Sequence, residues 1–264
     1  DYEAAAGNFH DFAAKYNKDS KRSDAAFNEA LCYFQGYHAG KKESHLVKAI
    51  KLFGSFAEDN RKHKLANTAW YYVGQLEHNR ENWMAAVKAL EPLIKGESNP
   101  AFGQLVFLVA DSYHRLKNWE KSAELYMQFA KGNEKELNAD VALHNAGVSY
   151  SNLKKPDTEQ AILAYEILDS KCPDSPHLPS ARLKLGIIYY QAGRFEEAKG
   201  PLRKIPFNHV LKADADYYLA WADLDNKKPI EAARSFQILR LRLTQTTPKH
   251  RLVPLCNLYQ GIAE

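Results

Sequence analysis

The stretch that decides the fold is ARLKLGIIYYQAGRFEEAKGPLRKI, residues 181–205. Its apolar residues recur at steps of three and four in two blocks, as amphipathic helices require. The blocks cover residues 181–191 and 196–205, and Gly193 stands in the short breaker between them. Because glycine commonly ends a helix, this stretch predicts two helices joined by a tight turn.

The same two-block pattern recurs along nearly the whole chain. Gly74, Gly147 and Gly186 take matching places in three first blocks, where a missing side chain lets two helix backbones approach closely. A small residue also stands near the start of each second block and returns every 34 to 44 residues, at Ala5, Ala49, Ala86, Ser122, Ala161, Ala198 and Ala232. Such a period indicates a stack of helical hairpins.

The repeated unit resembles the tetratricopeptide repeat, whose pattern is W-x2-L-G-x2-Y, A-x3-F and then P over about 34 residues. Two matching units are Trp70-x2-Val73-Gly74 with Ala86-x3-Leu90, and Leu185-Gly186-x2-Tyr189 with Ala198-x3-Leu202. The resemblance implies an all-α fold, a right-handed α-solenoid of antiparallel helix-turn-helix repeats that forms a superhelix. It also implies a role as a scaffold or adaptor for other proteins.

We expect residues 1–264 to form a single solenoid. Pro156 predicts a bent loop in the fourth unit, and residues 36–44 are either an extended first helix or a looped excursion. Because each end of the chain falls inside a repeat, we expect it to be part of a longer protein. The expected units are 1–20 (half), 24–60, 67–100, 103–136, 140–175, 179–210, 213–246 and 249–264 (half).

A finer resemblance concerns the second helices. The spacing Phe9-x2-Phe12-x3-Tyr16 is similar to a cadence in repeat proteins of the bacterial cell envelope. This resemblance favours a bacterial protein and leaves two locations open, the periplasm and the cytoplasm.

In the tetratricopeptide family, a concave groove is lined by fixed positions of the first helix of each unit. Carried onto this chain, those positions predict a partner-binding groove with a polar, histidine-bearing part and an apolar, aromatic part. The polar part contains Tyr71, Gln75, His78, Phe107, Asp111, His114 and His144. The apolar part contains Leu183, Ile187, Tyr190, Tyr217 and Trp221.

The aromatic part of the groove has two interpretations. Aromatic side chains are effective anchors for a peptide because they bury a large area at small entropic cost. Alternatively, a following repeat or a capping helix covers them. The family members that clamp a chaperone's carboxylate use Lys, Asn and Arg, and Gln75, Asp111 and His144 depart from that pattern.

Chemistry other than binding has little support in the sequence. His78, Asp111, His114 and His144 are residue types that bind metals, but the chain has no HExxH motif and no histidine pair at i, i+4 among them. We therefore expect no metal and no cofactor. The chain also lacks GxSxG and a glycine-rich phosphate loop, so we expect no enzyme activity.

The composition fits a folded helical protein, with 45% hydrophobic and 26% charged residues and a net charge of +4. Three cysteines are too few for a disulfide framework. We expect a protein or peptide partner in the groove and membership of a larger complex. The alternatives are a nucleic-acid-binding helical repeat, suggested by residues 232–263 with five Lys or Arg and no acid, and a cell-wall or carbohydrate-associated module.

Overall fold

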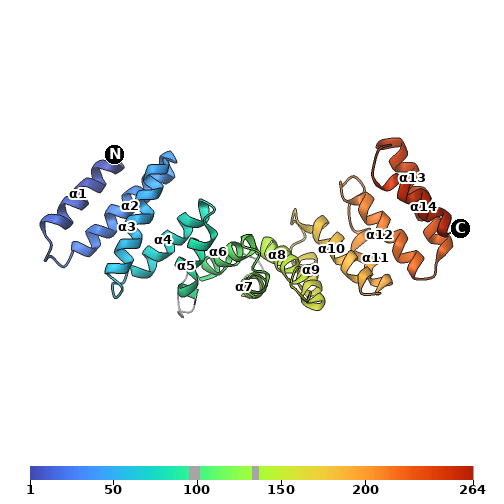
Figure 1. The fold of residues 1–264 in the computed structure, drawn as a ribbon, viewed down its shortest axis with the longest axis horizontal. Helices are drawn as coiled ribbons and strands as arrows, with labels where there is room; N and C mark the ends of the chain where they lie inside the picture. The colour runs from blue at the N-terminus through green and yellow to red at the C-terminus, as the bar shows by residue number, and fades with distance from the viewer. Residues whose placement is uncertain (95–101, 133–136, 264) are drawn as a thin grey trace. The chain divides into compact units, whose positions relative to one another are not determined.

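The computed structural model describes residues 1–94, 102–132 and 137–263, and these are organised as helices and the turns between them (Figure 1). The helices of the first half are α1 Tyr2–Lys15, α2 Arg22–Gly40, α3 Glu43–Asp59, α4 Ala66–Asn79, α5 Trp83–Ile94, α6 Phe102–Arg115 and α7 Trp119–Gly132. Those of the second half are α8 Ala139–Ser151, α9 Thr158–Lys171, α10 Leu178–Gln191, α11 Phe195–Arg203, α12 Lys212–Asp225, α13 Pro229–Thr246 and α14 Leu252–Ala263.

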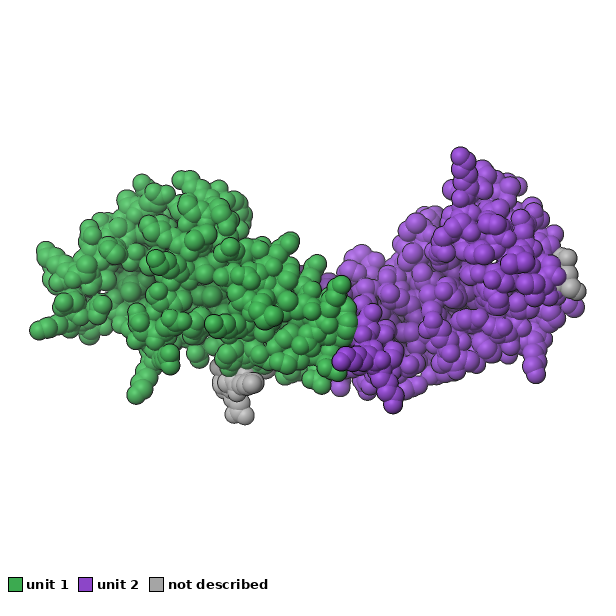
Figure 2. All heavy atoms as spheres, viewed as in Figure 1, with its two compact units in different colours: residues 1–129 green, residues 130–264 purple. Residues whose placement is uncertain are grey.

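The helices gather into two compact units, residues 1–129 and 130–264, coloured separately in Figure 2. In the first unit, Phe27, Phe53 and Phe56 form the centre of a buried cluster between α2 and α3. In the second unit, Phe236 and Leu239 of α13 are buried against α12 and α14. Each unit therefore has a hydrophobic core of its own. Burial of apolar surface in that core stabilises the fold of the unit.

Glycine on the first helix of a hairpin allows close contact with the second helix. A Cβ atom added to Gly74 would lie 2.1 Å from Cγ of Leu90, and one added to Gly186 would lie 2.4 Å from Cγ of Leu202. Both leucines are fully buried. The repeated glycine is thus required by the packing of α4 on α5 and of α10 on α11, because any side chain would displace a core leucine.

The turns inside several hairpins share one backbone geometry. Gly193, between α10 and α11, has a φ of 74°, and its neighbour Arg194 donates a backbone hydrogen bond to the carbonyl of Tyr189. The corresponding turns place Glu81, Lys117 and Lys227 at φ values of 63°, 56° and 59°. These residues adopt the left-handed conformation that ends a helix, and glycine adopts it without a steric penalty.

Two expectations about the longer repeats can now be compared with the structure. Residues 36–40 continue α2, which ends before Lys41 at a φ of 51°, so the long interval there is an extended first helix. Pro156 lies in the loop between α8 and α9, as predicted. The expected ends of two units, residues 95–100 and 133–136, lie outside the described residues.

Within the described part of the chain, none of the helices combines the length and the apolar character that a membrane crossing needs.

Candidate functional site

The residues predicted to line the groove lie on the first helices of successive hairpins, α4, α6, α8, α10 and α12, and we call them the first-helix surface. All of them are partly buried except Asp111, which is buried at 8% exposure. Partial burial is the property expected of side chains that pack at their base and present an edge to a ligand. The two compact units each carry a part of this surface.

In the first unit, the buried carboxylate of Asp111 organises the polar part. His78 of α4 lies 3.0 Å from one carboxylate oxygen, measured from Nε2 to Oδ2. The hydroxyl of Tyr126 on α7 donates a 2.9 Å hydrogen bond to the other oxygen, Oδ1. Arg115, one turn along α6, has its Nε 3.6 Å from Oδ2. One carboxylate therefore joins three helices, α4, α6 and α7.

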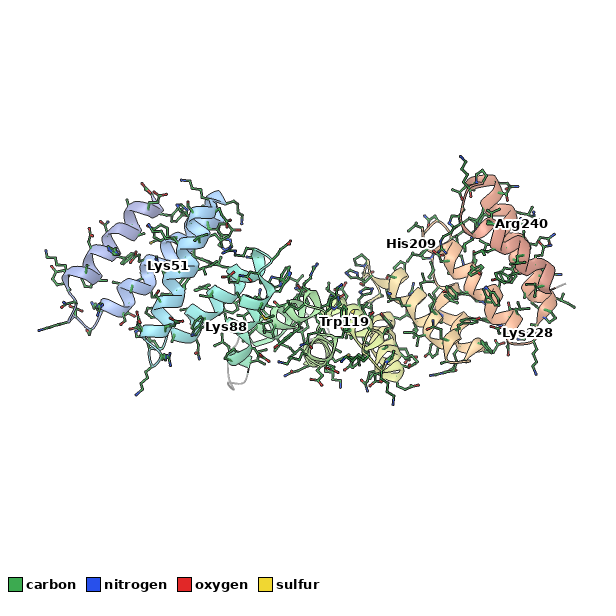
Figure 3. The ribbon with its side chains drawn as sticks, in the orientation of Figure 1. Lys51, Lys88, Trp119, His209, Lys228 and Arg240 are labelled. Carbon is green, nitrogen blue, oxygen red and sulfur yellow. The ribbon has the colours of Figure 1, made fainter. Side chains whose placement is uncertain are left out.

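Burial and hydrogen bonding act in opposite directions on this carboxyl group. Burial alone raises the pKa of Asp111, but the hydrogen bonds from His78 and Tyr126 and the charge of Arg115 outweigh it, so the pKa falls below its ordinary value. His114, one turn further along, has a pKa lowered mainly by burial. Its ring meets Trp119, labelled in Figure 3, edge-on at a centroid distance of 5.2 Å.

The remaining predicted residues of the first unit contribute packing. Tyr71 lies against a buried cluster centred on Leu90 and Val109, and burial raises the pKa of its phenol. Phe107 contacts the rings of Tyr126 and Phe129 at centroid distances of 5.7 and 5.4 Å. Gln75 is partly buried on α4. The polar part is thus supported from beneath by aromatic packing.

In the second unit, His144 of α8 connects to the next first helix. Its Nε2 lies 3.2 Å from the hydroxyl of Ser180 on α10, and its Nδ1 lies 3.2 Å from the amide oxygen of Asn145. Its ring also lies beside that of His177, at a centroid distance of 5.2 Å. His144 therefore belongs to the contact between α8 and α10.

The apolar part begins on α10. The hydroxyl of Tyr190 donates a 2.5 Å hydrogen bond to Asp225 at the end of α12. Burial, followed by this hydrogen bond, raises the pKa of the phenol. Leu183 packs on a buried cluster of Leu202, Ile205 and Ala215, and Ile187 lies partly buried between Leu183 and Tyr190 on the same helix.

At the end of this surface, α14 covers two predicted anchors. Trp221 meets Tyr259 of α14 at a centroid distance of 4.4 Å, and Tyr217 meets the same ring at 6.3 Å. Both side chains also contact the buried ring of Phe236. Of the two interpretations that the sequence left open, the structure shows a following helix packed on Tyr217 and Trp221.

The structure adds pairings that the sequence analysis did not predict. The lateral partners on neighbouring helices are Tyr126, Ser180, Asp225 and Tyr259. Three of the lateral contacts join residues 33 to 36 positions apart, which is close to one repeat. A search for polar pairs separated by one repeat length would have been the signal that finds them.

The histidines and acids of the first-helix surface lie in separate places. His78, Asp111 and His114 belong to the first unit, whereas His144 belongs to the second. Among the described residues, no three His, Cys, Asp or Glu side chains form a group suited to a metal ion.

The basic C-terminal stretch is partly neutralised by α12. Arg242 lies 2.8 Å from Asp216, and Arg251 pairs with Asp214. Arg240 of α13, labelled in Figure 3, has a buried Nε without a hydrogen-bond partner.

The helical hairpins and the row of first-helix residues define the chain as an all-α helical-repeat protein. Residues 180–206 match the family model of the tetratricopeptide repeat. The chain therefore carries a tetratricopeptide repeat within an α-solenoid of the tetratricopeptide-repeat type.

Solved structures support this fold. The C-terminal part of a TPR repeat-containing protein from Cytophaga hutchinsonii is similar with a TM-score of 0.59 and 13% identity, over 97% of this chain and 94% of that one. A chain of the Naa15/Naa10 complex bound to HypK-THB is similar with a TM-score of 0.59 and 14% identity, over 98% of this chain and 39% of that one. At such identities, the likeness concerns the fold alone. Comparison with curated proteins finds no match.

Proposed function

We propose that the chain is a protein–protein interaction scaffold whose first-helix surface binds a peptide or a segment of a partner protein. The mechanism is binding by shape and by apolar anchors, with polar groups that fix the position of the bound segment. Helical-repeat folds suit this role because each hairpin adds one strip of surface to a continuous array. The role is one of binding, and no chemical step is assigned to it.

The observation that carries the proposal is the lateral fixation of the surface. Tyr190 is held by Asp225, His78 by Asp111, and His144 by Ser180, so each polar side chain is fixed before a ligand arrives. A preordered surface loses less side-chain entropy when it binds, and more of the contact energy remains as affinity.

Within the second unit, Ile187 and Tyr190 are the best candidates for anchors. Both are partly buried and lie one turn apart on α10, whereas Tyr217 and Trp221 already pack against Tyr259. A bound segment can therefore reach Ile187 and Tyr190 without displacing α14.

The test is retention of a partner from a lysate of the source cells by the immobilised chain. Tyr190→Ala and Ile187→Ser should each weaken retention by about 2 kcal/mol or more if these residues are anchors. Ile230→Ser, at an exposed site of α13 away from this surface, is the matched control and should retain the partner. Thermal melts of all three variants establish that the fold is intact.

Equal retention by wild type and both α10 variants would contradict the assignment of the anchors. Loss in His78→Ala or Gln75→Ala instead would place the contact on the first unit. If neither the wild-type chain nor any variant retains a partner protein, the scaffold function itself is contradicted.

A further inference from the structure

A second surface lies on a different stripe of α12. Lys212, Asp216 and Leu219 follow one another at steps of four and three, so they share one side of the helix. With Ser235, Ile238, Leu239 and Arg242 of α13, and with Phe207 of the loop before α12, they line a pocket of about 290 Å³. We call it the α12–α13 pocket. Figure 3 labels His209, which lies in the same loop as Phe207.

Two large apolar side chains at this pocket are strongly exposed. Phe207 is 74% exposed and Ile238 is 60% exposed, although both side chains line the pocket. The guanidinium of Arg242 lies over the ring of Phe207, 5.2 Å from its centroid, and holds the ring at the rim. Single exposed apolar residues are common, but two that border one pocket form a surface that a ligand can bury.

The polar wall of the pocket carries an excess of positive charge. The carboxylate of Asp216 forms two ion pairs, with Oδ1 2.8 Å from Nζ of Lys212 and Oδ2 2.8 Å from a guanidinium nitrogen of Arg242. Two cations thus share one carboxylate, which leaves one net positive charge beside the apolar rim. Asp216 is the only acid among the residues that line the pocket, and the one acidic residue of α13, Glu231, lies one turn before Ser235 and outside this lining.

A corresponding pocket in the first unit has the opposite character. It lies between α2 and α3 and is lined at the same helical steps, by positions 22, 26 and 29 of α2 and 52, 55, 56 and 59 of α3. Its charged residues are two acids, Glu29 and Asp59, and one base, Arg22, so its net charge is negative, and Ser23, Ser55 and Asn60 add polar groups. The packing of two helices in a hairpin therefore creates a pocket at this place. The side chains of α12, α13 and the loop before α12 make the α12–α13 pocket apolar and basic.

We propose that the α12–α13 pocket docks a protein segment in which a large apolar side chain stands next to Asp or Glu. The apolar side chain enters between Phe207 and Ile238, and the neighbouring carboxylate pairs with Lys212 and Arg242. Charge complementarity selects such a segment over a basic one. This site is independent of the first-helix surface, because Tyr217 and Trp221 occupy another stripe of α12 and contact α14.

The experiment is selection of a phage-displayed library of random 12-residue peptides on the immobilised full chain. Enriched peptides are synthesised with a fluorescent label, and their affinities for the chain are measured by anisotropy. We expect the enriched set to contain an apolar residue within two positions of an Asp or Glu. Replacing that acid by its amide should weaken binding about tenfold, and raising the salt concentration should weaken it as well.

Variants of the chain locate the site. Ile238→Ser and Phe207→Ser, which alter exposed residues, should each reduce affinity at least tenfold, and Arg242→Gln should remove the preference for the acid over its amide. Ile230→Ser is the matched control, because Ile230 is 76% exposed on the same helix and does not line the pocket. Tyr190→Ala should leave the affinity unchanged, which separates this site from the first-helix surface.

The outcomes decide the proposal. No enrichment on wild type overturns it, as does an enriched set without acidic residues. Affinities that stay the same in both Ile238→Ser and Phe207→Ser also overturn it. Peptides that lose affinity in Tyr190→Ala but keep it in Ile238→Ser belong to the first-helix surface and count against the pocket.

Discussion

Tyr190 of α10 donates a 2.5 Å hydrogen bond to Asp225 of α12, a residue 35 positions along the chain. The bond joins the first helices of two successive hairpins at their exposed edge. His78 with Asp111 and His144 with Ser180 make comparable connections between first helices. The repeats are thus joined at the surface by polar side chains as well as in the core by apolar ones.

The Tyr190–Asp225 bond predicts an energetic coupling between the two residues. Tyr190→Phe and Asp225→Ala should each lower the free energy of unfolding by about 1 kcal/mol, since a net hydrogen bond contributes about that amount. The double variant should lose no more than either single one, because the interaction is lost only once. Urea unfolding of the four proteins measures the coupling, and strictly additive losses would contradict the bond.

Asp111 predicts a stability difference that depends on pH. Asp111→Asn should lower the free energy of unfolding at pH 7 by about 2 kcal/mol, because a charged acceptor for His78 and Tyr126 becomes neutral. Since the folded pKa of Asp111 lies below its ordinary value of 3.8, the stabilising effect is present above that value. It is lost as the pH falls through the folded pKa.

Urea unfolding between pH 7 and pH 2.5 measures this effect. The gap between wild type and Asp111→Asn should narrow as the pH falls below about 4, because the wild-type carboxyl becomes protonated. Asp11→Asn, at an exposed site of α1 in the same unit, is the control and should show a much smaller gap at pH 7. A gap for Asp111→Asn that is constant with pH would show that the loss is steric and not electrostatic.

The repeat pattern predicted the helix pairs well, and its success has a physical basis. Gly186 and Leu202 sit where a close approach of two helices needs them, so the pattern of small and apolar residues reports the packing inside a hairpin directly. Contacts between hairpins are different, because they depend on how far one repeat is shifted against the next. The partners of Tyr190 and Trp221 were therefore not predicted from the sequence.

Phe207 illustrates a second limit of the sequence analysis. It lies in the loop between α11 and α12, outside any helical period, and no pattern marked it. Its position matters because the guanidinium of Arg242, on α13, lies over its ring. A periodic pattern identifies residues that face a core. The role of a loop residue depends instead on which helix it contacts in the folded chain.

The close approach of α10 and α11 predicts opposite effects of alanine at two glycines. Gly186→Ala should destabilise the fold by about 1–3 kcal/mol, because the new Cβ would lie 2.4 Å from Cγ of buried Leu202. Gly54→Ala, inside α3, meets no atom of another helix within 4 Å of its new Cβ and should stabilise that helix by up to about 1 kcal/mol. Thermal melts compare the two, and equal effects would contradict the packing.

Because α14 packs on Trp221, we expect a mutation in α14 to change the environment of the indole. Tyr259→Ala removes the ring that lies 4.4 Å from the indole, so Trp221 should become more exposed and the fold should lose about 2 kcal/mol. The fluorescence emission should shift to longer wavelength. The same change in a Trp221→Phe background should leave the emission of the other three tryptophans unaltered.

Leu258→Ala is the control for this prediction, because Leu258 precedes Tyr259 on α14 but is 55% exposed. This variant should leave the emission wavelength unchanged. It should change the free energy of unfolding by no more than about 0.5 kcal/mol, as expected for an exposed site. If Tyr259→Ala behaves like this control, α14 does not cover Trp221. In that case Trp221 is open to a ligand and joins Ile187 and Tyr190 as an anchor to be tested.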